Sequence, residues 1–111
     1  MIKACIALEN GLLKSCRISG HAGAGPKGAD IVCAAVSVLA GTALKMLSER
    51  KGITAKGDCP ERGEFGLEIT DVNPENREFL AAAGMFLCEG LLLVSKEFPD
   101  FCKVSIDCLY V

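Results

Sequence analysis

The stretch from Ile31 to Leu44 constrains the fold more than any other feature, because it is apolar on nearly every side of the helix that it would form. Its only interruptions are Ser37, Gly41 and Thr42. A helix without a polar stripe must be covered on more than one side. We therefore expect a helix from Ile31 to Arg50 that packs on a sheet, with a second copy of this 111-residue chain as a plausible further cover.

Alternating apolar residues predict strands on both sides of this helix. Residues from Ile2 to Leu8 alternate, which is typical of a half-buried strand. Asn10-Gly11 then favours the positive φ angles of a tight hairpin turn, so that Leu12–Ser19 becomes the return strand. Further strands are expected at Gly52–Ala55, at Glu64–Ile69 and at Val104–Tyr110, with a turn at Cys59–Gly63.

A second helix is predicted to begin at Asn73-Pro74-Glu75, which supplies a cap, a proline at the first position and an early acid. Apolar residues recur at helical spacing from Phe79 to Val94, and Pro99 lies beyond the end. The expected order is ββαββαβ. This order predicts an α+β fold with two helices on a mainly antiparallel sheet, as a single domain over residues 1–111.

Composition excludes several classes of function. The net charge is −2 and no basic run exists, so direct nucleic-acid binding has little electrostatic support. The N-terminus lacks the pattern of a signal peptide. The longest apolar stretches are broken by Gly, Ser, Thr or charged residues, which argues against a transmembrane helix. We expect a soluble protein of the cytoplasm without a membrane partner.

The seven cysteines do not predict disulfides, because their number is odd and no CxxC pair occurs. Only one histidine is present and the cysteines lack paired spacing, so neither a metal site nor a cofactor is expected. Five cysteines lie in strand-like or helical segments and are interpreted as small buried hydrophobic residues: Cys5, Cys16, Cys88, Cys102 and Cys108.

The segment around Cys33 is the one place where the sequence favours chemistry. Residues 20–29 hold four glycines and a proline and are expected to be irregular. They carry His21, the single histidine. If Asp30 caps the following helix, Cys33 occupies its third position, where free N–H groups and the helix dipole stabilise a thiolate. His21 could take and return a proton, and the N–H groups could hold an oxyanion.

Simpler interpretations of the same residues remain open. Cys33 could be a small buried helix residue, and His21 could steady its loop through backbone hydrogen bonds. Asp30 could be only a cap, or it could also orient His21, while Ser37 could bond back to a helix carbonyl or line the site. Residues 23–28 also spell GxGxxG, a weak phosphate-loop signal, because a hairpin precedes them and no Ser or Thr follows Lys27.

With these residues laid out, the chain resembles the ribosomal-processing cysteine protease (Prp) family. The resemblance is carried by Gly20-His21-Ala22, by Gly28 and by Asp30–Ser37, with the sequence Asp-Ile-Val-Cys-Ala-Ala-Val-Ser. It implies a homodimeric cytoplasmic endopeptidase with His21 as base and Cys33 as nucleophile. Gly20, Ala22, Gly28, Asp30 and Ser37 would support the site or bind substrate.

The resemblance further implies a substrate and a cleavage site. Family members remove a short N-terminal extension from a large-subunit ribosomal protein, the bacterial L twenty-seven protein, after an aromatic residue in an apolar stretch. The competing hypothesis is a non-enzymatic module, ribosome-associated or anion-binding, whose glycine-rich loop grips a ligand through backbone N–H groups.

Overall fold

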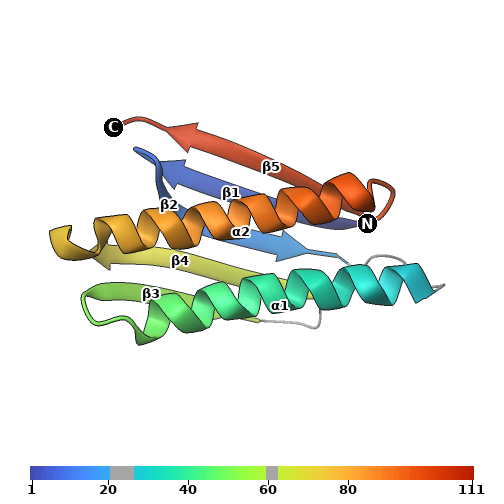
Figure 1. The fold of residues 1–111 in the computed structure, drawn as a ribbon, viewed down its shortest axis with the longest axis horizontal. Helices are drawn as coiled ribbons and strands as arrows, with labels where there is room; N and C mark the ends of the chain where they lie inside the picture. The colour runs from blue at the N-terminus through green and yellow to red at the C-terminus, as the bar shows by residue number, and fades with distance from the viewer. Residues whose placement is uncertain (21–26, 60–62) are drawn as a thin grey trace.

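The computed structural model describes residues 1–20, 27–59 and 63–111. Two helices lie side by side on one face of a five-stranded sheet (Figure 1). The elements in order are β1 (Ile2–Glu9), β2 (Leu12–Ser19), α1 (Lys27–Glu49), β3 (Ile53–Asp58), β4 (Glu64–Val72), the 3₁₀ turn η1 (Pro74–Asn76), α2 (Arg77–Glu97) and β5 (Cys102–Leu109). The predicted α+β fold and its ββαββαβ order are confirmed.

The strand order across the sheet is β3-β4-β2-β1-β5. Three of the pairings are antiparallel, and β5 runs parallel to β1 at one edge. In β1 the side chains of Ile2, Ala4 and Ile6 are buried while those between them are not. This period of two places one face of the sheet under the helices and leaves the opposite face to solvent.

The helices divide the covered face between them. α1 packs over β3, whereas α2 packs over β2 and β5. A β-carbon at Gly84 of α2 would lie 3.1 Å from the Leu13 side chain of β2, so the helix approaches that strand closely. The Ser95 hydroxyl of α2 donates to the Cys102 carbonyl of β5 over 2.9 Å. The largest fully buried side chains are Ile6, Leu13, Leu47, Leu67, Leu80, Leu87 and Leu91.

The start of α1 differs from its prediction. The helix begins at Lys27, so the expectation of irregular structure up to Ala29 was wrong for the last three residues. Asp30 lies inside the first turn and is not the N-cap. Cys33 consequently lies in the second turn instead of at the third position. The helix-forming residues Lys27 and Ala29 outweigh the single glycine between them.

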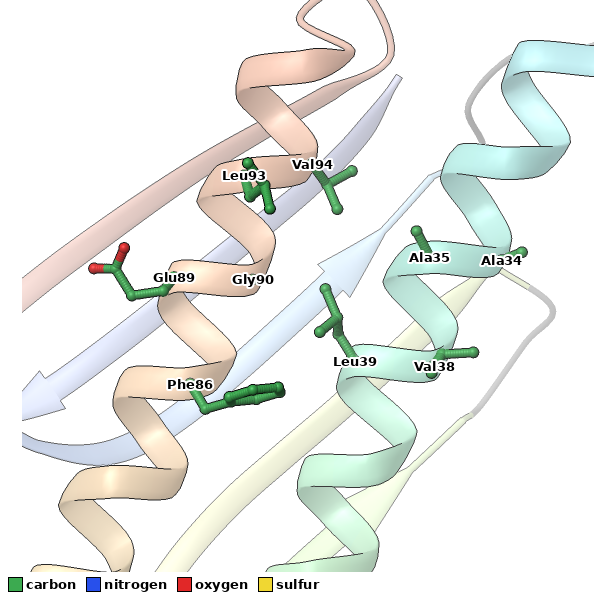
Figure 2. A pocket seen from close by; sticks show the side chains of 9 residues that line it. All are labelled: Ala34, Ala35, Val38, Leu39, Phe86, Glu89, Gly90, Leu93 and Val94. Atoms are coloured by element: carbon green, nitrogen blue, oxygen red, sulfur yellow. The ribbon is translucent and has the colours of Figure 1, made fainter.

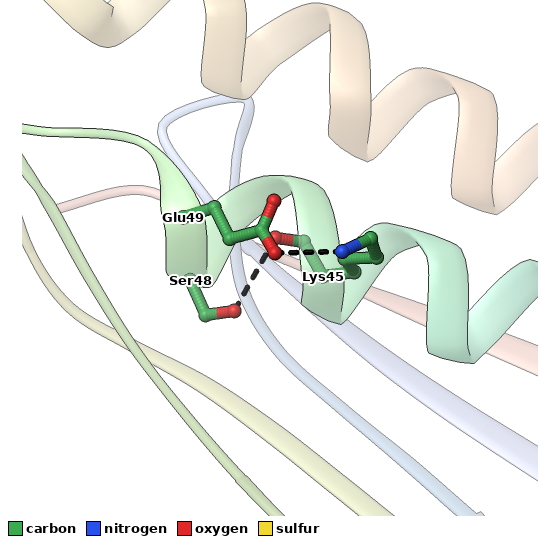
Figure 3. A network of polar contacts seen from close by, with 3 residues as sticks. All are labelled: Lys45, Ser48 and Glu49. Atoms are coloured by element: carbon green, nitrogen blue, oxygen red, sulfur yellow. Dashed lines mark hydrogen bonds and ion pairs between the residues drawn. The ribbon is translucent and has the colours of Figure 1, made fainter.

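The far end of α1 closely follows the prediction. The helix stops at Glu49, one residue before the expected Arg50. The Lys45 ammonium donates to the Glu49 carboxylate over 2.7 Å, and the Ser48 hydroxyl donates to the Lys45 carbonyl over 3.3 Å (Figure 3). The ion pair is exposed at both ends, so it contributes only about 0.3–0.5 kcal/mol to the helix.

Two cysteines that were predicted to be buried are exposed. Cys16, Cys88 and Cys102 are buried as predicted, but Cys5 and Cys108 are exposed. Cys5 lies on the uncovered face of the sheet, since its neighbours Ala4 and Ile6 point toward the helices. Cys108 lies near the end of an edge strand, where no further strand lies beside it.

The two helices have the length and the hydropathy that a membrane-spanning helix needs. In the part of the chain that the structure describes, Ile31–Glu49 and Pro74–Glu97 are long and apolar enough to cross a bilayer, with mean hydropathies of 1.9 and 1.7. Composition alone therefore does not exclude a spanning helix, and the expectation of no membrane partner stays a prediction. Both segments pack on the sheet, so the fold itself accounts for part of their apolar composition.

A buried asparagine ties the end of α1 to the start of α2. Asn76 is 5% exposed, and its side-chain amide donates to the Lys51 carbonyl and to Asn73 Oδ1, each over 2.7 Å. Its Oδ1 accepts from Arg50 Nε over 2.9 Å. Asn73 also accepts from the Asn76 N–H, which confirms the predicted cap. The guanidinium of Arg50 stacks 4.2 Å from the centre of the Phe79 ring.

We predict that Asn76→Ala lowers the free energy of unfolding by roughly 2–4 kcal/mol, because buried donors and acceptors lose their partner. Urea unfolding followed by circular dichroism measures this. The matched control is Ser48→Ala, whose hydroxyl bonds the Lys45 carbonyl at an exposed site in the last turn of α1, so that a change below about 0.5 kcal/mol is expected. Equal effects of the two substitutions would contradict the role given to Asn76.

Candidate active site

The structure describes some of the predicted site residues, and the others lie outside the described residues. Cys33 and Ser37 lie one turn apart on α1, half-buried and exposed respectively. Gly28 and Asp30 belong to the first turn of the same helix. Gly20 directly follows β2. His21 and Ala22 fall outside the described residues, so the pairing of His21 with Cys33 stays a prediction.

Helical geometry fixes which flank of α1 carries the thiol. Leu44 contacts β3, because a β-carbon at Gly57 would collide with its side chain. Cys33 precedes Leu44 by eleven residues, and at about 100° per residue the two positions lie within about 20° of one another around the helix. Ser37 lies within about 40° of Cys33 by the same arithmetic. Cys33 and Ser37 therefore share the flank that faces β3.

Three strands have their ends together at one end of the sheet. β2 ends at Ser19, which pairs with Glu64 at the start of β4. β3 ends at Asp58, which pairs with Gly66. The end of β3 and the start of β4 therefore lie at the end of the sheet from which the chain continues to α1. No local pattern indicated this neighbour, because residues 59–63 have only the composition of an ordinary turn.

Gly20 fixes where the chain leaves β2. Its φ is +93°, a left-handed conformation that side chains with a β-carbon rarely adopt. A β-carbon there would also collide with the carbonyl oxygen of Met1. Both constraints require glycine at the position where the chain leaves β2.

The start of α1 at Lys27 changes the electrostatic argument for Cys33. The N–H groups without a helical partner belong to the first four residues, 27–30, and the dipole effect weakens beyond the first turn. Cys33 lies past that turn. Activation of its thiol therefore depends less on the helix end than the sequence predicted, and more on a neighbouring base.

The buried cysteines have raised thiol pKa values, whereas a thiol nucleophile needs a lowered one. Burial raises the pKa of the Cys16 thiol to about 12, with smaller contributions from Cys88 and Cys5. Burial also raises the pKa of Cys88 and of Cys102. Such thiols stay protonated near neutral pH and are poor nucleophiles. Cys33 is half-buried at the margin of the core, where a substrate can approach.

A groove runs between the helices on a different flank of α1 (Figure 2). Leu39 and Gly90 meet at its floor, because a β-carbon at Gly90 would lie 2.7 Å from the Leu39 side chain. The lining is apolar except for Glu89, whose carboxylate points away from α1. The lining residues are Ala34, Ala35, Val38, Leu39, Phe86, Glu89, Gly90, Leu93 and Val94. Cys33 is not among them.

Among the residues that the structure places, no three His, Cys, Asp or Glu side chains gather closely enough to hold a metal ion. The chemistry that this region offers is that of a thiol near the start of a core helix, beside a glycine-rich segment. A thiol in this position is a candidate nucleophile for a thiol-dependent enzyme.

The chain belongs to the cysteine protease Prp family, whose model matches residues 1–103. This membership confirms the resemblance and supports protease activity. Among solved structures, SMU.848 from Streptococcus mutans is 26% identical, with a TM-score of 0.82 over 97% of this chain and 95% of that one. A search of curated proteins found no match.

Two structures of the ribosomal processing protease Prp from S. aureus share the fold. The one with a covalently linked product peptide is 20% identical, and the one with a substrate peptide is 16% identical. Each has a TM-score of 0.79 and is aligned over 96% of this chain and 100% of that one.

The raised pKa of Cys16 predicts a loss of stability at alkaline pH. The ordinary thiol pKa is 9.0 and the folded value is about 12, so the unfolded chain releases this proton first. The stabilising contribution is complete below pH 9 and declines between pH 9 and 12, by up to about 1.4 kcal/mol per pH unit.

Urea unfolding of wild type and Cys16→Ala from pH 8 to pH 11, under reducing conditions, tests this prediction. All other groups are common to the two proteins, so only the difference between the two slopes reports on Cys16. We expect the wild type to lose stability more steeply above pH 9. Parallel curves would show that the buried thiol titrates normally.

Proposed function

We propose that this chain is a cysteine endopeptidase that removes a short N-terminal extension from a large-subunit ribosomal protein, the bacterial L twenty-seven protein. The observation that carries the proposal is Cys33, a half-buried thiol on the β3-facing flank of α1 in a chain matched by the family over residues 1–103. The peptide complexes of the S. aureus relative, described as a ribosomal processing protease, support a peptide substrate.

In the proposed reaction His21 takes the Cys33 proton, and the thiolate attacks the peptide carbonyl that follows an aromatic residue. A carbon–sulfur bond forms, and the oxyanion is held by backbone N–H groups. The carbon–nitrogen bond then breaks as the imidazolium returns its proton to the leaving amine. Water, deprotonated by His21, attacks the thioester, which releases the acid and restores the thiolate.

The remaining site residues have supporting roles in this proposal. Gly20 and Gly28 flank the segment that holds His21 and Ala22, and their lack of side chains lets a substrate backbone approach. Ser37 shares the flank of Cys33 and would line the site. Asp30 would orient His21, since its position inside the first turn removes the capping role.

Cys33→Ala should abolish cleavage of a synthetic peptide that carries the extension and its cleavage site, while the fold is retained. Removal of a nucleophile costs several orders of magnitude in rate. Mass spectrometry of the peptide products measures the rate, and circular dichroism checks the fold. The control is Cys5→Ala, which removes an exposed thiol from the uncovered face of the sheet and should leave the rate unchanged. Cleavage by Cys33→Ala at the wild-type rate would refute the assignment.

His21→Ala should slow both peptide cleavage and alkylation of Cys33 near neutral pH. The imidazole is the expected activator, because Cys33 lies beyond the first turn of α1. Iodoacetamide labelling of Cys33, followed by peptide mapping across a range of pH, gives the apparent thiol pKa in each protein. Superimposable curves for wild type and His21→Ala would show that His21 does not influence the thiol.

We further propose that the protein acts in the cytoplasm as a homodimer. Apolar side chains on the outer faces of both helices support self-association. Ile31 and Val38 of α1 are 57% and 67% exposed, and Phe86 and Leu93 of α2 are 68% and 56% exposed. Large exposed apolar patches commonly mark interaction surfaces, and two-fold pairing is the commonest way to cover them.

A further inference from the structure

β3 is the edge strand of the sheet that lies beside the flank of α1 with the thiol (Figure 1). The two elements meet where the Leu44 side chain reaches Gly57. Cys33 lies eleven residues, or about 16 Å, further toward the start of α1 on the same flank. An extended chain covers this distance in about five residues. A peptide that is held along β3 can therefore present one of its bonds to the thiol.

The backbone of β3 directs the groups of alternate residues outward from the sheet. The Asn73 N–H donates to the Gly52 carbonyl over 2.9 Å, so the even-numbered residues of this strand face β4. The extra residue at the register shift belongs to β4, so β3 itself keeps this alternation. The N–H and C=O groups of Ala55 and Gly57 therefore point outward, where a further strand would pair with them.

The flank of α1 beside this edge carries small side chains. Cys33, Ser37 and Gly41 follow one another at every fourth residue. A β-carbon at Gly41 would meet nothing within 4 Å, whereas one at Gly90 of α2 would lie 2.7 Å from Leu39. Packing within the chain therefore explains Gly90 but not Gly41, although glycine weakens the interior of a helix. The close approach of a chain from outside would explain Gly41.

Both features fit an extended peptide as the ligand. Strand addition binds a peptide through its main chain, while alternate side chains meet the surface beside the edge. The side chain of Ile53 is buried and Gly57 faces Leu44, so the odd-numbered residues of β3 face the helix layer. A strand paired with them would direct every second side chain toward the small residues of α1. β5, the other edge, lies beyond β2 and β1 and is remote from this flank.

We propose that the substrate peptide binds as an additional strand on the outer edge of β3, hydrogen-bonded to the backbone of Ala55 and Gly57. The bond that is cleaved then lies about five residues from the paired segment. This inference rests on the proposed protease function and adds to it the surface that holds the substrate.

A proline in the edge provides the first test. Ala55→Pro removes an outward N–H donor, and its ring occupies the place of the paired backbone. Proline is accepted in edge strands where the N–H faces solvent, so the fold should be retained, which circular dichroism checks. We expect KM for the cleavable peptide to rise about fivefold or more, because a hydrogen bond made remote from the reacting bond is lost. Alkylation of Cys33 by iodoacetamide should be unchanged.

The matched control is a proline on the opposite edge of the sheet. The Ile2 N–H donates to the Phe101 carbonyl over 2.8 Å, so the odd-numbered residues of β5 face β1 and Cys108 faces outward. Cys108 is also exposed. Cys108→Pro should therefore keep both the fold and the KM of wild type.

Synthetic peptides that are methylated at one backbone nitrogen at a time test the pairing without any change to the protein. Only alternate residues of a strand bond to the neighbouring edge. KM should therefore rise at alternate amides about five residues from the cleaved bond and stay unchanged at the amides between them. This series decides the question if Ala55→Pro does not fold.

The outcomes separate this binding surface from the proposed reaction. An unchanged KM in folded Ala55→Pro would overturn the proposal, and so would equal sensitivity at consecutive amides of the peptide. Equal increases in Ala55→Pro and Cys108→Pro would also overturn it, because the effect would not be specific to β3. A wild type that cleaves no peptide would refute the proposed protease together with this inference, whereas cleavage without these effects refutes only the role of β3.

Discussion

Two long apolar helices share one face of a single sheet, and most of the structure follows from how closely they can approach it and each other. The close approach of the helices depends on glycines, which have no side chain. Gly57 receives the Leu44 side chain where α1 meets β3, and Gly90 receives Leu39 where α1 meets α2. These two contacts set the rotation of α1 about its axis. The rotation in turn directs Cys33 and Ser37 toward β3 and directs Leu39 toward α2.

The periodic segments were predictable from the sequence because their signals are local. The alternation in Ile2–Leu8, the Asn10-Gly11 turn and the Asn73 cap each depend on a few neighbouring residues, and each is confirmed. The start of α1 was not predictable in this way, since Asp30 is a plausible cap and the preceding glycines suggest a loop. The exposure of Cys5 and Cys108 depends on strand order and on the uncovered face, which no local pattern contains.

The residues of the candidate site were predicted from motif positions alone. Cys33 and the segment around it lie within the residues 1–103 that the family model matches, and their roles stay predictions. The flank of α1 on which Cys33 lies could be determined only from a distant contact, Leu44 with Gly57. Residues that are neighbours in the sequence do not share a surface here. Ala34 and Ala35 follow Cys33 directly, yet they line the groove on another flank of α1. Burial keeps the thiol of Cys16 protonated, so this residue of β2 acts as a small apolar side chain in the core.

The rotation of α1 also separates the surface for self-association from the candidate site. The exposed apolar side chains Ile31 and Val38 lie on the outer side of α1, next to the groove that α1 forms with α2. Cys33 and Ser37 lie on the flank that faces β3. Pairing of two copies through the outer helix faces would therefore cover the groove, while the flank with the thiol stays open to a peptide.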